Sequence, residues 1–324
     1  MSTVFKNLTN SDVAQTKTLL HEAIPLTGTI VSGTYSDLNI KNYAHGMFQS
    51  VYDYPYLSAS SNHIFDITYG YDSSLSGTTH VQNAKKLNIY NQMAQVLAGY
   101  DSNNVVRSFD KDGNYVTTGS DQTMNACVFI TYARLLTKDE IKKGSYTFEI
   151  LSGSTAITIG DYGAATNYRV NSPSGEFGLL YTASDGGGDS VGHIYYQAGI
   201  AVLTSSAVLF DSFLQFTGTL SISGTADNVR SEWLDNNFNN TTELNSTIYF
   251  CRLNPNEYNY SSNPTYLTES KVQVKNISSD QPISYITTIG LYSADNELLA
   301  VAKLSEPIKK TDSNSITLRV RMDY

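Results

Sequence analysis

Residues 316–323 alternate strictly between apolar and polar side chains, and no other feature of the chain constrains its fold as strongly. Such a period of two is the side-chain repeat of a β-strand. It predicts one buried face and one face toward solvent or a partner, which is typical of an antiparallel sheet. The chain ends at Tyr324, so we expect its terminus to be tied into the sheet. The apolar positions are Ile316, Leu318, Val320 and Met322, and the polar ones are Thr317, Arg319, Arg321 and Asp323.

A hairpin is predicted just before this strand. Residues 283–292 and 297–304 are two apolar runs around the short turn 293–296, which contains Asp295 and Asn296, and this arrangement is a hairpin signal. Further strands are expected at 63–71, 104–109, 124–132, 145–151 and 194–203. The fold class is therefore mainly β with a minor helical part, built as antiparallel sheets or a β-sandwich.

Two short helices are expected. In 82–98, apolar residues recur at helical spacing, and Gly99 stands where a C-terminal cap is wanted. In 8–23, Asn10 or Ser11 can cap a helix that Pro25 would end.

The chain divides by composition into three parts. Residues 1–150 read as a mixed α/β part, 151–238 as a loop-rich middle, and 239–324 as an antiparallel β part that packs with the first in one β-rich unit. In the middle part, 152–166, 183–192 and 204–228 are rich in Ser, Thr and Gly, as flexible segments are.

Charge and aromatic content favour protein contacts. Only 16% of the residues are charged, whereas 24 are Tyr, and interfaces are depleted in charge and enriched in Tyr. A Tyr-rich β-protein without a special interface is the plainer interpretation. The net charge is −9 with no basic run, so we expect no nucleic-acid partner. No apolar run is long enough to span a membrane, so no membrane partner is expected.

Motifs for catalysis or ligand binding are missing from the sequence. The five histidines form no metal-ligand spacing, and no nucleophile elbow or phosphate-binding loop occurs. Asp110 and Asp112 lack the rest of a calcium loop and favour a β-turn. Cys127 and Cys251 each lie in an apolar stretch and are interpreted as buried thiols, although pairing stays open. We therefore expect no catalytic residues, no cofactor and no metal.

Several stretches resemble a family of virion structural proteins from contractile-tailed, T-even-like phages of marine bacteria and cyanobacteria. The resemblance covers most of the chain except 152–166 and 204–236, and the family implies no catalytic residues. The hairpin at 289–302 is also similar, over a short length, to one in baseplate-attached tail-fibre proteins, which favours the tail over the capsid. The stretches that carry the family resemblance are 19–30, 46–57, 239–252, 259–266, 290–307 and 318–324.

The resemblance implies a non-enzymatic assembly subunit of the tail, baseplate or neck, assembled in the host cytoplasm and located in the virion. Its partners would be other virion proteins and copies of itself. A capsid-surface or decoration protein is one alternative. A glycan-binding module of the tail tip is the other, for which Trp233 is the single tryptophan. Interface contacts are expected from the Tyr-rich segments and the terminal strand, with core packing as the competing interpretation: Tyr43, Tyr52, Tyr54, Tyr56, Tyr258, Tyr260, Tyr266, Arg319, Arg321 and Tyr324.

Overall fold

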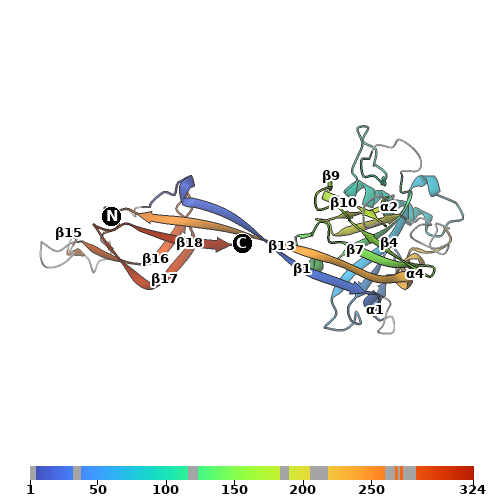
Figure 1. Ribbon diagram of the computed structural model, residues 1–324, viewed down its shortest axis with the longest axis horizontal. Coiled ribbons are helices and arrows are strands. Elements are labelled where there is room, and N and C mark those ends of the chain that lie inside the picture. The colour runs from blue at the N-terminus through green and yellow to red at the C-terminus, as the bar shows by residue number, and fades with distance from the viewer. Residues whose placement is uncertain are drawn as a thin grey trace. The chain divides into compact units, whose positions relative to one another are not determined.

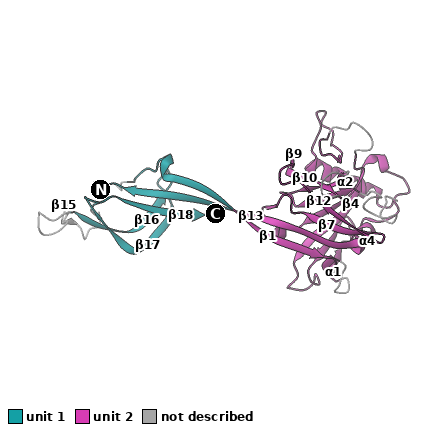
Figure 2. Cartoon of the chain, viewed as in Figure 1, with its two compact units in different colours: residues 1–18, 243–324 teal, residues 19–242 magenta. Residues whose placement is uncertain are grey.

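The computed structural model describes residues 5–31, 38–115, 123–182, 190–204, 218–259, 267–268, 271–272 and 282–324. The fold is mainly β, as the sequence predicts, with large antiparallel sheets (Figure 1). The chain divides into two compact units (Figure 2). Unit 1 comprises residues 1–18 and 243–324, and unit 2 comprises residues 19–242. This division differs from the three expected parts, because 151–238 belongs to the same unit as most of 1–150.

Unit 2 is built on one long sheet with the strand order β13-β7-β8-β10-β11-β12-β5-β4-β3-β2. Short strands β6 and β9 pair with β13 and β10. The strand bounds are β2 (Ile40–Asn42), β3 (Gln49–Tyr52), β4 (His63–Tyr71), β5 (Ala126–Tyr132), β6 (Glu140–Ile141), β7 (Thr147–Ser152), β8 (Thr155–Gly160), β9 (Arg169–Ser172), β10 (Gly175–Tyr181), β11 (Ser190–Tyr195), β12 (Ile200–Thr204) and β13 (Trp233–Leu253). The helical elements are α1 (Gly28–Val31), η2 (Ser73–Leu75), α2 (Asn83–Leu97), α3 (Arg134–Thr137) and α4 (Ile222–Glu232).

Both faces of this sheet are buried, as strand β5 shows. Its residues Val128 and Ile130 lie in one hydrophobic cluster, whereas Cys127 and Phe129 lie in a second cluster that includes residues of α2. Successive side chains of a strand point to opposite faces, so the nearly continuous apolar sequence of β5 follows from having a core on each side.

The sheet curls so that its two ends share the first cluster. The Trp233 ring of β13 stacks on the Phe65 ring of β4 at a centroid distance of 4.9 Å, and it meets the Phe148 ring of β7 edge-on at 4.6 Å. The Trp233 Nε1–H donates to the Leu26 carbonyl at 3.3 Å. The single Trp is therefore a central core residue that joins strands far apart in the sheet order.

Of the two expected helices, one is confirmed and one is wrong. Helix α2 covers 83–97, and Gly99 follows it with φ +79° and its N–H bonded to the Ala94 carbonyl. In place of a helix at 8–23, the chain forms the 3₁₀ turn η1 (Asn10–Asp12) and then strand β1 (Val13–Thr27), which lies beside β13. The capping residues support only that turn, and pairing with a distant strand overrides local helix propensity.

The strands at 63–71, 124–132 and 145–151 are confirmed as β4, β5 and β7. The segment 194–203 is two strands, β11 and β12, because Gly199 with φ +66° permits a tight turn between them. No strand forms at 104–109, where one bridge joins Tyr100 and Val106. The loop-rich interpretation of 152–166 and 204–228 is wrong where β8 and α4 form, while 183–189 and 205–217 lie outside the described residues.

Unit 1 holds antiparallel strands, including the first residues (13–18) of β1, which lies beside β13. Strand β18 (Ile316–Asp323) pairs with residues 246–253 of β13, and strands β16 (Ile283–Tyr292) and β17 (Leu298–Thr311) form the predicted hairpin. Leu318 and Val320 of β18 are buried while Arg319 and Arg321 are exposed, which confirms the predicted two-faced strand. A short pair, β14 (Leu267–Thr268) and β15 (Lys271–Val272), completes the elements.

Candidate functional site

The Tyr-rich segment 43–57 gathers at one edge of the unit 2 sheet. The Tyr43 ring stacks on His45 at 5.1 Å, and the Tyr52 ring lies 6.2 Å from Tyr56. The Lys41 ammonium lies over both Tyr43 and Tyr56, at 4.7 and 5.9 Å from the ring centroids. The structure therefore brings Tyr43, Tyr52 and Tyr56 into one partly buried cluster around a cation, with Tyr54 more exposed beside it.

The remaining expected interface residues belong to unit 1. Arg319 and Arg321 lie on the exposed face of β18, and Tyr258 is partly exposed near the hairpin base. Tyr324 is 70% exposed, yet its backbone exchanges two hydrogen bonds with Asn245, so the C-terminal residue is tied to β13 as predicted. Tyr260 and Tyr266 lie outside the described residues.

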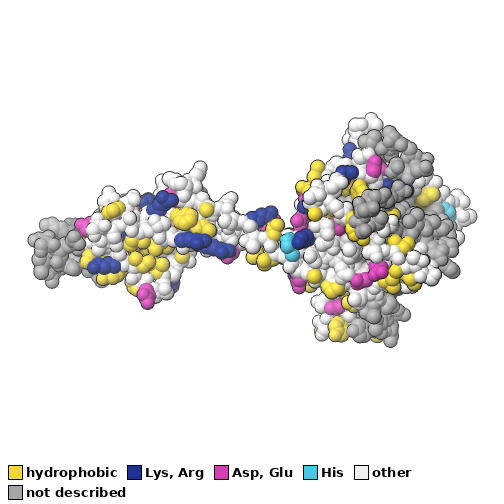
Figure 3. Space-filling view, viewed as in Figure 1, with side chains coloured by type: hydrophobic (Ala, Val, Ile, Leu, Met, Phe, Trp, Pro, Cys, Tyr) yellow, Lys and Arg dark blue, Asp and Glu magenta, His cyan; other side chains and the backbone are white. Residues whose placement is uncertain are grey.

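The described residues of unit 1 form no hydrophobic core of the kind that unit 2 has. Both clusters of buried apolar residues belong to unit 2, and among the described residues of unit 1 the buried apolar side chains are Ile248, Leu318 and Val320. Large apolar side chains of unit 1 face solvent instead, and Figure 3 shows hydrophobic side chains gathered on this unit. They are Phe5, Leu8, Leu244, Tyr258, Tyr285, Tyr292, Leu298, Leu299, Val301 and Tyr324.

A groove of about 810 Å³ runs through unit 1. Tyr249, Cys251 and Leu318 line it from the β13–β18 ribbon, and consecutive residues of β16 line it from the hairpin. The Phe5 ring closes on Tyr292 at 4.8 Å. The walls of the groove are mostly apolar, as a site for another protein's side chains requires. Sequence reasoning predicted the strands but missed the groove.

The base of the hairpin is held by polar contacts. Lys310 is fully buried, and its Nζ donates to the Pro255 carbonyl at 3.0 Å, to Asn259 Oδ1 at 2.7 Å and to the Thr311 carbonyl at 2.6 Å. The Ser284 hydroxyl, on the strand opposite, donates to the Tyr258 carbonyl. These bonds fix one end of the hairpin while its apolar residues stay exposed.

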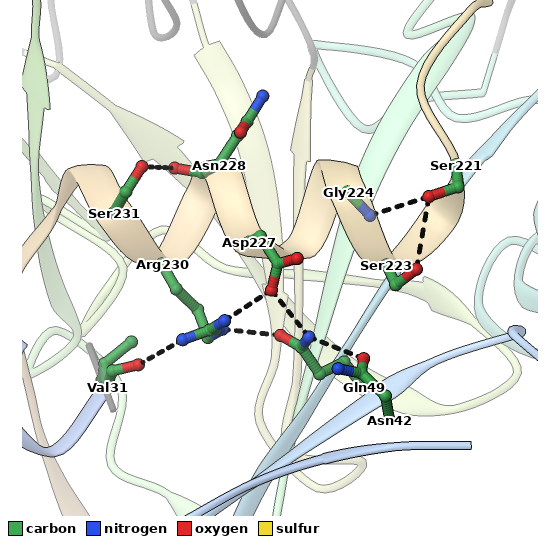
Figure 4. A network of polar contacts seen from close by, with 10 residues as sticks. All are labelled: Val31, Asn42, Gln49, Ser221, Ser223, Gly224, Asp227, Asn228, Arg230 and Ser231. Carbon is green, nitrogen blue, oxygen red and sulfur yellow. Dashed lines mark hydrogen bonds and ion pairs between the residues drawn. The ribbon is translucent and has the colours of Figure 1, made fainter. Parts of the chain in front are cut away.

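Unit 2 contains a buried polar network on α4 (Figure 4). Arg230 donates from Nε to Gln49 Oε1 at 2.6 Å, from Nη1 to the Val31 carbonyl at 3.0 Å and from Nη2 to Asp227 Oδ1 at 2.5 Å. Gln49 in turn donates to Asp227 and to Asn42, each at 2.8 Å. All the guanidinium nitrogens are bonded to protein, so this network docks α4 onto β3 and α1.

Two further titratable groups of unit 2 are enclosed by its core. Burial lowers the pKa of His193 to about 4, so the ring is neutral near pH 7. Burial also raises the pKa of Asp161 to about 6, although its carboxylate accepts bonds from Gly144 N–H, Tyr146 N–H and Tyr196 O–H. The histidine contacts Phe177 and Tyr195 rather than an open pocket, so neither arrangement provides a site for a substrate.

The other chemical candidates are structural where the chain is described. Residues 110–113 form the predicted turn, with the Gly113 N–H bonded to the Asp110 carbonyl. Cys127, which is fully buried as expected, and the partly buried Cys251 are both free. Among the described residues, no three or more His, Cys, Asp or Glu side chains are placed to hold a metal ion.

In the described part of the chain, no helix is long and apolar enough to cross a membrane.

Comparison with known proteins finds no relative of this chain. No protein-family model, no curated protein and no solved structure matches this chain.

Proposed function

We propose that this chain is a non-enzymatic structural subunit of a tailed-phage virion, placed in the tail, baseplate or neck, and that it acts through protein–protein interfaces. The observation that carries the proposal is the contrast inside unit 1, where the described residues expose large apolar side chains around a groove and bury few. A monomer rarely leaves a large contiguous apolar surface in water without an interaction that covers it. The sequence resemblance supplies the virion as the setting.

Unit 2 is suited to the same role because it is rigid. Its sheet is packed on both faces, and α4 is fixed by a network in which Arg230 is fully bonded. An assembly subunit needs a part that keeps its shape while another part binds. Trp233 is 3% exposed and stacked on Phe65, so its ring does not offer a sugar a stacking platform, and the glycan-binding alternative would depend on tyrosine rings instead.

The test is to locate the protein in particles of the phage that encodes it. Mass spectrometry of gradient-purified virions should find the chain at a fixed ratio to the major tail proteins. After mild dissociation it should sediment with tails and not with heads. Its absence from intact virions would overturn the proposal, and sedimentation with heads would move the subunit to the capsid.

A further inference from the structure

Two strand pairs of unit 1 leave open the space that a β-sandwich fills. In a sandwich, side chains from two sheets interdigitate across about 10 Å to form the core. Here the β13–β18 ribbon and the β16–β17 hairpin both line the groove of about 810 Å³. The described side chains of unit 1 therefore make only part of a core, and additional apolar side chains would complete it.

The hairpin in particular needs a covering surface. A lone two-stranded hairpin is marginally stable in water, and among the strands that the structure describes β16 and β17 pair only with each other. Thr288, Gly290 and Tyr292 share a face with Lys303 and Val301, and every one of these residues is exposed. The Gly290 Cα is overlaid by the Tyr292 ring and the Leu298 side chain, which a Cβ would meet at 2.8 and 3.2 Å. Because Gly290 has no side chain, the apolar side chains of Tyr292 and Leu298 can pack over this part of the strand.

The edge of the hairpin is protected, in contrast to its face. Register in the hairpin shifts so that residues 304–307 of β17 lie opposite the single residue Thr287. Pro307 within this bulge has no N–H to donate. Bulges and edge prolines block the addition of another strand. A partner is therefore expected to bind by side-chain packing on the face and in the groove, not by extending the sheet.

Charge indicates which partner fits. Unit 1 contains ten Lys or Arg and ten Asp or Glu residues, so its formal net charge is zero. Unit 2 contains eleven basic and twenty acidic residues, so it carries the whole net charge of −9. Zero net charge favours self-association, whereas a large charge of one sign opposes it. A strongly charged partner would find no net attraction to unit 1, and a second unit 1 meets no net repulsion from it.

We propose that unit 1 binds unit 1 of a second copy of this chain. The apolar hairpin face, defined as Tyr292, Leu298, Leu299 and Val301, of each copy closes the groove of the other. Tyr292 and Leu299 also line the groove, so the same side of unit 1 faces its counterpart in both copies, as an isologous interface requires. The inference rests on the proposed function and names its partner.

The experiment measures the mass of the purified full-length chain in solution. Sedimentation equilibrium from about 1 to 100 µM, a range that brackets typical protein–protein affinities, should give a multiple of 35.6 kDa for the wild type. Leu299→Asp should weaken association at least about tenfold, because it places an unpaired charge in the closed interface. Leu299 is 67% exposed in the single chain, so the substitution should leave folding intact, and circular dichroism verifies this.

The matched control is Leu135→Asp, which makes the same change at a 62% exposed leucine of unit 2. It should associate as the wild type does. A wild-type chain that stays monomeric at the highest concentration overturns the proposal, as does equal weakening by both variants. A monomer that is nevertheless a fixed component of virions would leave the proposed function standing, whereas an oligomer missing from virions would refute the function and keep the interface.

Discussion

The two units of this chain are stabilised by different interactions. Unit 2 buries aromatic and aliphatic side chains on both faces of its sheet, so that Phe65, Phe129 and Phe148 are fully enclosed. Unit 1 has comparable strands but no such cluster among its described residues, and the Lys310 ammonium fixes its hairpin through hydrogen bonds. The free energy of burial is therefore realised within unit 2 and is still available for binding in unit 1.

This difference shows that the number of paired strand residues does not by itself set the stability of a unit. Backbone pairing alone contributes modestly, because water replaces each lost hydrogen bond in the unfolded chain. Burying a large side chain contributes about 1.5–3 kcal/mol. The first two variants below test whether a residue of unit 2 behaves as core while a counterpart in unit 1 does not.

The largest effect is expected for Phe65→Ala. Phe65 is fully buried and stacks on Trp233, so its loss removes a ring that joins two ends of the sheet and leaves a cavity. The free energy of unfolding of unit 2, from urea titration followed by tryptophan fluorescence, should fall by about 3–5 kcal/mol. The control in unit 1, Leu299→Ala, should change this free energy of unfolding by less than about 0.5 kcal/mol. Similar losses in the two variants would contradict the comparison.

Arg230→Ala should come next. It leaves Gln49 Oε1 and the Val31 carbonyl without their donor inside unit 2, and because each unsatisfied buried acceptor costs about 1–3 kcal/mol, the free energy of unfolding should fall by about 3 kcal/mol. Arg321→Ala in unit 1 is the control, since Arg321 bonds Asp323 with both side chains about half exposed, and exposed pairs contribute about 0–1 kcal/mol. Thermal unfolding of both variants tests this expectation. A loss of stability in Arg321→Ala equal to that in Arg230→Ala would contradict it.

The elements predicted well are those whose signal is local. The hairpin of β16 and β17, strand β18 and helix α2 each follow from a repeat and a turn or cap within a few residues. Strand β1 was missed because its partner β13 is remote in sequence, and no local pattern records that pairing. Helix α4 could have been found from the Ser221 cap and the helical spacing of Ile222, Ala226 and Val229, but the Ser/Thr/Gly content of the segment favoured a loop.

The groove was beyond sequence reasoning for a different reason. A residue such as Leu299 looks the same in sequence whether it is buried by its own chain or left open for another. Alternation predicts that one face of a strand is covered, but not by what. The interface role of Tyr43 and Tyr52 stays a prediction, whereas the burial of Trp233 could not be predicted because it depends on Phe65 and Phe148, which lie far away along the chain.

Acid should affect unit 2 through His193. Its pKa is about 6.5 in an unfolded chain and about 4 when buried, so the neutral ring stabilises the fold above pH 6.5, and this contribution is lost as pH falls to 4. The loss amounts to about 3 kcal/mol. Asp161, whose pKa burial raises to about 6, acts in the opposite direction between pH 3.8 and 6.

The variant His193→Phe therefore measures how much protonation of this histidine contributes to the pH dependence of stability. The stability difference between wild type and variant, measured by urea titration at pH 7 and at pH 4, should shift by about 3 kcal/mol in favour of the variant at the lower pH. Phenylalanine keeps a ring against Phe177 and Tyr195 but cannot take up a proton. Two parallel pH profiles would show that the buried ring does not titrate as its surroundings require.

The smallest effect, and the one that most sharpens the contrast, is expected for Lys310→Met. Methionine keeps the buried stem but removes the three bonds that Nζ donates at the hairpin base, so β16 and β17 should open more easily while unit 2 is unchanged. Hydrogen exchange of the hairpin amides should accelerate about 10–30-fold, or about 1.5–2 kcal/mol. Lys309→Met is the control, because Lys309 is the exposed neighbour on the same strand. If instead both variants exchange alike, polar anchoring does not hold the hairpin, and the cohesion of unit 1 must come from apolar contacts like those of unit 2.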